Sequence, residues 1–341
     1  MKRLLSVVLL LLLLAVAGAT ALWYQYNAFL QSPLRFEQPG LTLNIEAGAN
    51  LRSVLVQLEK QGVTRFDWRW RLLGRMQQAT IKTGEYLLTD GLMPTQLLEL
   101  LASGKVINYR FTIVEGWTVK QLLSELAKDP VLAHSVETVT ELTDLDFLSS
   151  GNPEGWFLPE TYVYVRGDSD REILQRAHEH MMVALNEAWY GRDQGLPYET
   201  PEELLIMASI VEKETSIAGE RAEIAGVFVR RLLKNWRLET DPTVIYGMGE
   251  NFDGDIRRSD LKTDTPYNTY TRRGLPPTPI ALPGKAALQA AAHPAQGETM
   301  FFVANGQGGH TFSVTLEDHN KAVQDLIRRQ RNKPDKTGDG S

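Results

Sequence analysis

Cysteine is absent from the 341 residues of the sequence. Its absence excludes disulfide bonds, thiolate metal sites and cysteine nucleophiles. Basic residues are in the minority, with 36 lysines and arginines against 42 acidic residues and a formal net charge of −6. We therefore expect neither nucleic acid nor an anionic membrane surface to be the main partner.

The sequence also lacks the motifs that hold metals, nucleotides or an activated serine. No H-E-x-x-H pair, P-loop, dinucleotide-binding glycine motif or G-x-S-x-G elbow is found. His293 ends a run of alanines and His310 follows two glycines, and neither has a second ligand at metal-site spacing. We expect no metal and no cofactor.

Charge is missing from one long stretch, residues 4–23, which is dominated by Leu, Val and Ala. At about 1.5 Å per residue, these roughly twenty residues span the ~30 Å of a bilayer core. Lys2 and Arg3 precede the stretch, and the next basic residue is Arg35. This asymmetry predicts a single-pass anchor at residues 1–23 in the cell inner membrane, with a cytoplasmic N-terminus and the rest of the chain in the periplasm.

A cleaved signal peptide is the alternative for this stretch, because residues 19–21 (ATA) resemble a cleavage site. The apolar run is longer than the ~7–15 residues usual for a signal peptide. Trp23, Tyr24 and Tyr26 follow as an aromatic belt at a membrane surface would. We therefore favour a retained anchor.

The remaining chain exceeds one average domain, and we expect two. Residues 24–40, with Pro33 and a Pro-Gly pair, indicate a short stalk. A small domain is predicted at residues 41–110 and a larger one at 111–331, followed by a disordered polar tail at 332–341.

Three segments share an order of strand, glycine turn and helix, beginning at residues 41–45, 86–88 and 111–116. Thr118 is well placed to cap the helix of the last one. Such units resemble the LysM-like modules that bind cell-wall glycans, and they are equally compatible with simple packing of helices on strands.

Further helices are predicted at residues 169–190, 201–217, 219–235 and 316–331. Residues 301–303 and 312–314 form strand patterns across a glycine-rich turn, and we expect them to pair antiparallel. The predicted class is α+β, with an N-terminal transmembrane helix, a small LysM-like domain and a larger α+β domain.

The helix predicted over residues 203–215 is apolar on nearly its whole circumference, which indicates a buried helix. Yet it carries Glu212 and Glu214 in its last turns, and Glu214 falls within an apolar stripe. Burial raises the pKa of a carboxyl from about 4.3 toward 6 or more, which suits a general acid for cleavage of a glycosidic bond. The other interpretation is a carboxylate paired with Arg221, Arg230 or Arg231.

Residues 237–298 are rich in Gly, Pro, Thr and Tyr, with too little apolar content for a core. Long ordered loops of this kind are typical binding surfaces, and tyrosine rings suit sugar rings. The alternative is a loop whose turns serve only the structure.

Several segments together resemble the endolytic murein transglycosylases of the YceG-like family. They are residues 154–162 (EGWFLPETY), 208–215 (ASIVEKET), 240–247 (TDPTVIYG), 267–270 (YNTY), 274–277 (GLPP) and 309–312 (GHTF). Any one motif is weak, but together with the anchor and the length they cover nearly the whole chain.

The resemblance implies cleavage of the MurNAc–GlcNAc β-1,4 bond in nascent peptidoglycan strands without water. The C6 hydroxyl of MurNAc attacks its own anomeric carbon and leaves a 1,6-anhydro end. One carboxylic acid serves both halves of the reaction, and the resemblance maps it onto Glu214. The implied substrate-binding residues are Thr215, Asp241, Thr243, Tyr246, Tyr267, Asn268, Tyr270 and His310.

The implied partners are glycan strands of peptidoglycan, the membrane and peptidoglycan synthases. Arg221, Arg257 and Arg258 are candidates to offset the charge of an anionic glycan. Two alternatives stay open: an ordinary glycoside hydrolase with Asp241 as base or nucleophile, and a non-catalytic glycan-binding scaffold. If Glu214 proves dispensable, Glu212 is the next candidate acid.

Overall fold

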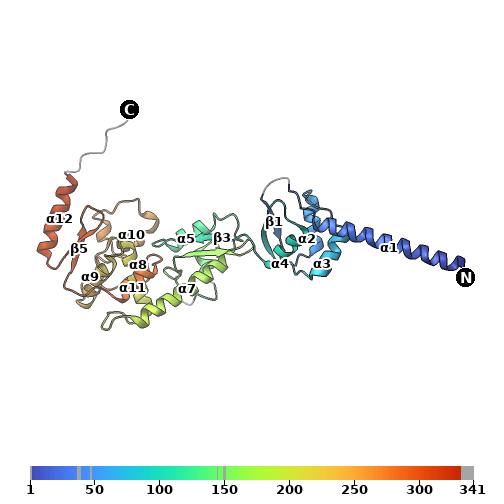
Figure 1. The fold of residues 1–341 in the computed structure, drawn as a ribbon. Helices are drawn as coiled ribbons and strands as arrows, with labels where there is room; N and C mark the ends of the chain where they lie inside the picture. The colour runs from blue at the N-terminus through green and yellow to red at the C-terminus, as the bar shows by residue number, and fades with distance from the viewer. Residues whose placement is uncertain (1, 37–39, 47, 144, 149–150, 332–341) are drawn as a thin grey trace, which may run out of the picture. The chain divides into compact units, whose positions relative to one another are not determined.

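A computed structural model describes residues 2–36, 40–46, 48–143, 145–148 and 151–331 (Figure 1). The tail predicted at residues 332–341 lies outside the described residues. The chain divides into two units, of which the first holds residues 1–109 and 163–167 and the second holds residues 110–162 and 168–341. Both units combine helices with small sheets, as the predicted mixed class requires.

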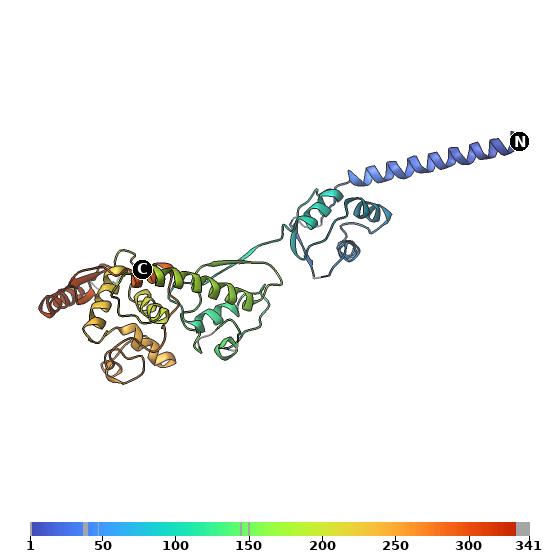
Figure 2. The ribbon, with the colours of Figure 1, turned by 90° about the horizontal axis from the view of Figure 1, so that it is seen from below.

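The first unit begins with α1 (Lys2–Leu30), drawn in blue in Figure 1 and seen as one unbroken helix in Figure 2. Its segment Arg3–Leu30 is long and apolar enough to span a membrane, which agrees with the anchor predicted from composition. Residues 24–30, assigned to a stalk from the sequence, form the last turns of α1 because neither Gly nor Pro interrupts them. Phe29 is only 7% exposed and belongs to the core of the first unit.

A small antiparallel sheet and short helices make up the rest of the first unit. β1 (Leu41–Ile45) pairs with β2 (Gly84–Leu88), and the register sets Leu43 opposite Tyr86. The helices are α2 (Leu51–Lys60), α3 (Trp68–Gln77) and α4 (Pro94–Ser103). Leu43, Tyr86 and Trp70 of α3 are fully buried in one apolar cluster, so the sheet and the helices share a core.

The chain enters the second unit within β3 (Tyr109–Thr112), which pairs with β4 (Thr161–Tyr164). α5 (Val119–Leu126) follows β3, and Thr118 caps it as predicted by accepting a hydrogen bond from the N–H of Gln121. The short α6 (Val139–Thr143) precedes the segment that returns to β4.

The rest of the second unit is mainly helical. Its elements are α7 (Asp170–Gly191), α8 (Pro201–Glu214), α9 (Arg221–Leu233), α10 (Asp241–Met248), the 3₁₀ turns η1 (Gly249–Asn251) and η2 (Asp260–Lys262), α11 (Lys285–Ala292), β5 (Phe301–Ala304), β6 (His310–Ser313) and α12 (Leu316–Arg331). β5 and β6 pair antiparallel, as the sequence predicted.

α8 is the central helix of the second unit, in contact with α7, α9, α10 and α11. Its residues 204–211 are all buried, so the prediction of an apolar, enclosed helix is confirmed. The interpretation of residues 237–298 as one long loop was wrong in part, because α10 and α11 lie within them. α10 forms despite its Gly and Thr content because Pro242 stands in its first turn, where a missing N–H costs no hydrogen bond.

Candidate active site

The C-terminal end of α8 places Glu214 at the edge of the core. Thr200 caps the start of α8, whereas Thr215 has an extended backbone and ends the helix immediately after Glu214. The residues before Glu214 are enclosed by neighbouring helices, so its carboxyl emerges from apolar surroundings and is itself only partly exposed.

Burial raises the pKa of Glu214 to about 7. The buried hydroxyl of Thr240 donates a hydrogen bond to the carboxyl and opposes the rise, while the negative charge of Asp241 adds to it. The charges of His310 and Arg231 favour the ionised form more weakly. A carboxyl with this pKa holds a proton at neutral pH and releases it easily, as acid catalysis requires.

None of the three arginines considered from the sequence neutralises Glu214. Among the described residues, Arg221 lies 3.8 Å from Glu212, and Arg231 lies 3.5 Å from Glu239. Arg230 donates to the carbonyls of Ala295 and Thr299. The ion-paired interpretation therefore fits Glu212 and not Glu214.

Glu212 connects three segments of the second unit. Its Oε2 accepts a hydrogen bond of 2.9 Å from the N–H of Gly284, and its Oε1 faces Arg221. Arg221 also lies 3.9 Å from Glu115, and its side chain is 11% exposed. Held between two carboxylates, Arg221 is poorly placed to meet an anionic glycan.

The other two arginines proposed for an anionic glycan lie near the 3₁₀ turns. Arg257 forms an ion pair with Asp253, whereas Arg258 is exposed and forms no ion pair with a described acidic residue. Of the three, Arg258 is the side chain with a free charge.

Asp241 and Tyr270 form a pair beside Glu214. The Tyr270 hydroxyl donates to Asp241 over 2.6 Å, and Asp241 itself is exposed. Burial, followed by the bond to Asp241 and the charges of Asp241 and Glu214, raises the pKa of Tyr270 above its usual range. The pair thus brings a carboxylate and a neutral phenol next to the carboxyl of Glu214.

Thr243 and Asn268 lie beneath this surface. Thr243 is fully buried and Asn268 is 1% exposed. The Asn268 amide donates to the carbonyls of Asp260, Leu261 and Thr263, and its oxygen accepts from the N–H of Tyr270. The contacts that the structure gives them are to the protein, and they hold the loop that carries Tyr270.

His310 is positioned by Glu220. Its ring Nδ1 lies 2.7 Å from Oε2 of Glu220, and its backbone N–H donates to Oε1 of the same carboxylate over 2.9 Å. The Thr215 hydroxyl also donates to Glu220, over 3.4 Å. A Cβ on Gly309 would lie 2.6 Å from Oε1 of Glu220, so a larger residue here would displace the carboxylate that holds His310. Glu220 thereby joins two of the predicted site residues, although no local sequence pattern pointed to it.

Tyr246 and Tyr267 lie beside a second buried carboxyl, that of Glu154. Their rings meet edge to face, with centroids 4.9 Å apart. The Tyr246 hydroxyl donates to Glu154 over 3.1 Å, and the Tyr267 hydroxyl lies 2.9 Å from that of Thr278.

A cavity of about 1130 Å³ is lined in part by α10 and Glu154. Its wall is formed by the start of α5, residues 151–154, residues of α6 and α10, and the turn that follows α10. Lys213 and Pro242 also line it, and they are the sequence neighbours of Glu214 and Asp241. The cavity is thus adjacent to the Glu214 region and is large enough for a ligand beyond drug size.

Glu154 lies in the wall of this cavity and is 5% exposed. Besides Tyr246, it accepts a hydrogen bond of 3.0 Å from the N–H of Val119, the first residue of α5. Burial raises its pKa to about 7 despite these donors. The segment 154–162 was noted from the sequence, but Glu154 was not chosen, because its burial depends on residues far away in the chain.

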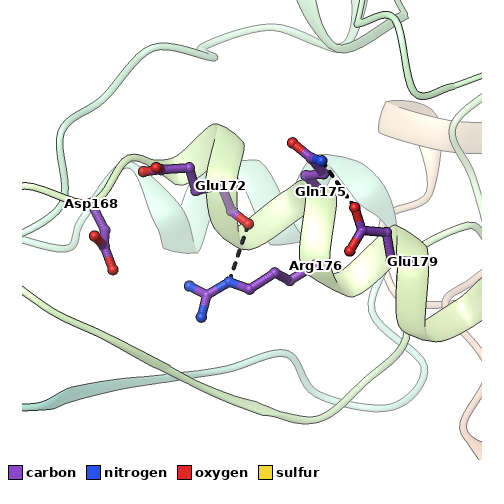
Figure 3. Close-up of a pocket in the computed structure, with 5 residues that line it drawn as sticks. All are labelled: Asp168, Glu172, Gln175, Arg176 and Glu179. Atoms are coloured by element: carbon purple, nitrogen blue, oxygen red, sulfur yellow. Dashed lines mark hydrogen bonds between the residues drawn. The ribbon is translucent and has the colours of Figure 1, made fainter.

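A smaller hollow of about 260 Å³ runs along α7 (Figure 3). Gln175 donates to Glu179 there, and Arg176 donates to the backbone carbonyl of Glu172. Such pairing within a charged helix face is typical of a solvated surface. We assign this hollow no function.

Replacing Glu154 with glutamine is expected to stabilise the protein more at about pH 8 than at about pH 5. The folded pKa of about 7 exceeds the unfolded value, so the wild-type free energy of unfolding falls as pH rises from about 4.3 to 7. Glutamine does not titrate, and its advantage should grow by about 2–3 kcal/mol between the two pH values. Urea unfolding at both pH values measures this difference.

Glu250 provides the matched control for this experiment. The hydrogen bond from Lys120 holds the pKa of Glu250 below its usual value, so Glu250 is already ionised at about pH 5. Glu250→Gln should therefore show no growing advantage. An equal effect of Glu154→Gln at both pH values would contradict the raised pKa of Glu154.

The described residues contain no cluster of three or more His, Asp or Glu arranged to hold a metal ion.

Comparison with known proteins identifies the family of the chain. The model of the YceG-like family matches residues 43–325. The chain belongs to the YceG-like family. A relative from Bacillus subtilis, named endolytic murein transglycosylase, is 28% identical over 342 residues, covering 94% of this chain and 93% of the relative.

Two further comparisons agree with this family assignment. A Streptococcus pneumoniae protein of the same name is 25% identical over 330 residues, covering 86% of this chain but 59% of the relative. The crystal structure of a YceG-like protein from Listeria monocytogenes matches with a TM-score of 0.52 and 29% identity, covering 84% of this chain and 99% of that one.

Proposed function

We propose that this YceG-like chain is an endolytic murein transglycosylase with Glu214 as its catalytic acid. The observation that carries the proposal is the desolvated carboxyl of Glu214 at the end of α8. It accepts a hydrogen bond from Thr240, its pKa is raised to about 7, and no arginine among the described residues forms an ion pair with it. The relatives named endolytic murein transglycosylase support the substrate class.

In the proposed reaction Glu214 first donates its proton to the bridging oxygen of the MurNAc–GlcNAc bond. The bond between that oxygen and C1 of MurNAc breaks, and GlcNAc leaves with a free hydroxyl. The resulting carboxylate accepts the proton of the C6 hydroxyl of MurNAc while the C6 oxygen forms a bond to C1. The acid is regenerated, no water is consumed, and a second carboxylate is not needed.

The residues around Glu214 have supporting roles in this proposal. Thr240 orients the carboxyl, and the negative charge of Asp241 favours its protonated form. Thr215, Asp241, Tyr270 and His310 would contact the glycan near the bond that breaks. Tyr246 and Tyr267 would line its course toward the cavity, while Thr243 and Asn268 would act by holding the loop.

We place the enzyme at the outer surface of the cell inner membrane, with α1 as the anchor and the N-terminus in the cytoplasm. Residues 41–110 would be a LysM-like domain that contacts glycan. An anchored enzyme works where nascent strands emerge, so peptidoglycan synthases are the proposed neighbours and termination of strand growth is the proposed outcome.

Mass spectrometry of digested peptidoglycan tests the reaction. The expected products carry 1,6-anhydroMurNAc at the newly formed ends and have no added water. Reducing MurNAc ends without any anhydro product would instead indicate a hydrolase with Asp241 as base. Intact strands after incubation with the folded protein would indicate a scaffold.

The rate of cleavage is expected to be highest below about pH 7 and to fall about tenfold per pH unit above it. Glu214 must be protonated to act, and its pKa is about 7. Burial is the main cause of this value, and the hydrogen bond from Thr240 and the charges of Asp241, His310 and Arg231 adjust it. The pH dependence of kcat/KM measures the pKa in the free enzyme.

Asp241→Asn sharpens this experiment. Removing the negative charge should lower the pKa of Glu214. The alkaline limb of the kcat/KM profile, where the rate falls with rising pH, should therefore move to lower pH. A limb that stays in place would show that another group controls the rate.

A further inference from the structure

α3 carries an apolar stripe on its exposed side. Trp68, Leu72 and Met76 are spaced four residues apart and are 39, 38 and 67% exposed. At about 100° per residue they share one face. Trp70 and Leu73, which are 0 and 3% exposed, point into the core instead. Packing within the unit accounts for Trp70 and Leu73 but not for the three residues of the stripe, because the outer face of a soluble helix is ordinarily polar.

Arginines flank this stripe on both sides. α3 contains Arg69, Arg71 and Arg75 and no acidic residue, although the whole chain has a net charge of −6. Arg69 is paired with Asp67, whereas Arg71 and Arg75 are exposed and form no ion pair with a described acidic residue. Exposed Trp, Leu and Met between arginines are typical of helices that lie in a membrane interface.

The stripe contacts α1 just beyond the uncharged residues 4–23. The Tyr26 hydroxyl donates to Sδ of Met76 over 3.5 Å, and the rings of Tyr26 and Trp68 have centroids 6.4 Å apart. Tyr26 follows the uncharged residues 4–23 by only three positions. Trp23, the last of these uncharged residues, is 67% exposed, as an interfacial aromatic residue would be.

We infer that the exposed face of α3 lies on an anionic phospholipid surface beside the exit of α1. Trp68, Leu72 and Met76 enter the boundary between headgroups and acyl chains, and Arg71 and Arg75 meet the phosphates. The inference rests on the proposed role of α1 as a membrane anchor. It adds that the first unit has a fixed face toward the membrane, because a single helix leaves rotation about its axis free whereas a second contact removes it.

Single cysteines introduced into this cysteine-free chain allow a direct test. The full chain with Leu72→Cys is labelled with a fluorophore and reconstituted in vesicles that contain phosphatidylglycerol and lipids with a nitroxide near the headgroup. Strong quenching at position 72 is expected. Leu14→Cys in α1 should be quenched by nitroxides deep in the acyl chains, and Glu59→Cys on the exposed side of α2 should stay unquenched.

The outcomes separate the inference from the anchor. A label at position 72 that is no more quenched than one at 59, with position 14 quenched, overturns the inference alone and indicates a protein partner or no partner. An unquenched label at position 14 overturns both. Arg71→Gln with Arg75→Gln should reduce quenching at position 72 in anionic vesicles but change little in zwitterionic ones, and an equal effect in both would overturn the electrostatic part.

Discussion

Replacing Glu214 with glutamine is expected to lower kcat for glycan cleavage by about 10²–10⁴-fold, the range that a general acid supplies. The amide keeps the size of the carboxyl and a group that can bond to Thr240, but it has no proton to give to the leaving oxygen. It also cannot accept the proton of the C6 hydroxyl afterwards. Both halves of the proposed reaction therefore fail together.

The measurement is the yield of 1,6-anhydroMurNAc ends from purified glycan strands. Binding of those strands should persist, because Glu214→Gln removes no positive charge and opens no cavity. Folding should also be preserved, since the variant replaces a desolvated carboxyl whose ionisation opposes folding.

Glu212→Gln is the matched control, two residues away on α8. Glu212 accepts from Gly284 and faces Arg221, so its loss should reduce stability while most activity remains in the folded fraction. The assignment of the acid would move to Glu212 if Glu214→Gln kept making anhydro ends and Glu212→Gln did not.

Replacing Arg231 with methionine is expected to lower the free energy of unfolding by about 3–5 kcal/mol. Arg231 is 7% exposed, and its guanidinium donates to the carbonyls of Leu238 and Met300 over 2.8 and 2.9 Å. Methionine fills a similar volume but leaves these carbonyls without their donor. Glu239 would lose its ion-pair partner as well.

The same change should affect catalysis through charge. Arg231 favours the ionised form of Glu214, so its removal should raise the pKa of Glu214 further and move the alkaline limb of the rate profile to higher pH. Urea unfolding and the pH profile of the folded fraction measure the two effects. A purely structural role for Arg231 would leave the limb unchanged.

Arg328→Met serves as the control for stability. Arg328 is exposed on α12 and lies 3.7 Å from Asp325. Exposed ion pairs contribute little, and we expect a change within about 0.5 kcal/mol. Comparable losses at Arg231 and Arg328 would contradict the importance of the buried contacts.

Local sequence patterns were sufficient for much of the fold. The uncharged stretch at residues 4–23, the cap at Thr118 and the enclosed α8 were all predicted, because apolar periodicity and capping depend on neighbours within a few residues. The same patterns failed for α10, whose Gly and Thr content indicated a loop. There the first-turn proline and the packing of α10 on α8 outweighed weak local propensity.

Pairing between distant residues could not be predicted in this way. Three arginines were equally placed by sequence to neutralise Glu214, yet the one that faces α8 meets Glu212 instead. Glu154 was one of 42 acidic residues. Only the approach of Val119 and Tyr246 distinguishes it, and these residues lie 35 and 92 positions away in the chain.

The sequence by itself determined the apolar helix at the N-terminus, the mixed class and the burial of α8, because each depends on the order of residue types along short segments. The choice of Glu214 came from the resemblance to the YceG-like family and stays a prediction. Only the tertiary structure decided that Glu214 escapes ion pairing, that Thr240 bonds it, that Glu220 positions His310 and that a second buried carboxyl lines a cavity nearby. The reason is physical: the pKa of a carboxyl depends on the groups within a few ångströms of it, and folding brings most of those groups from far along the chain.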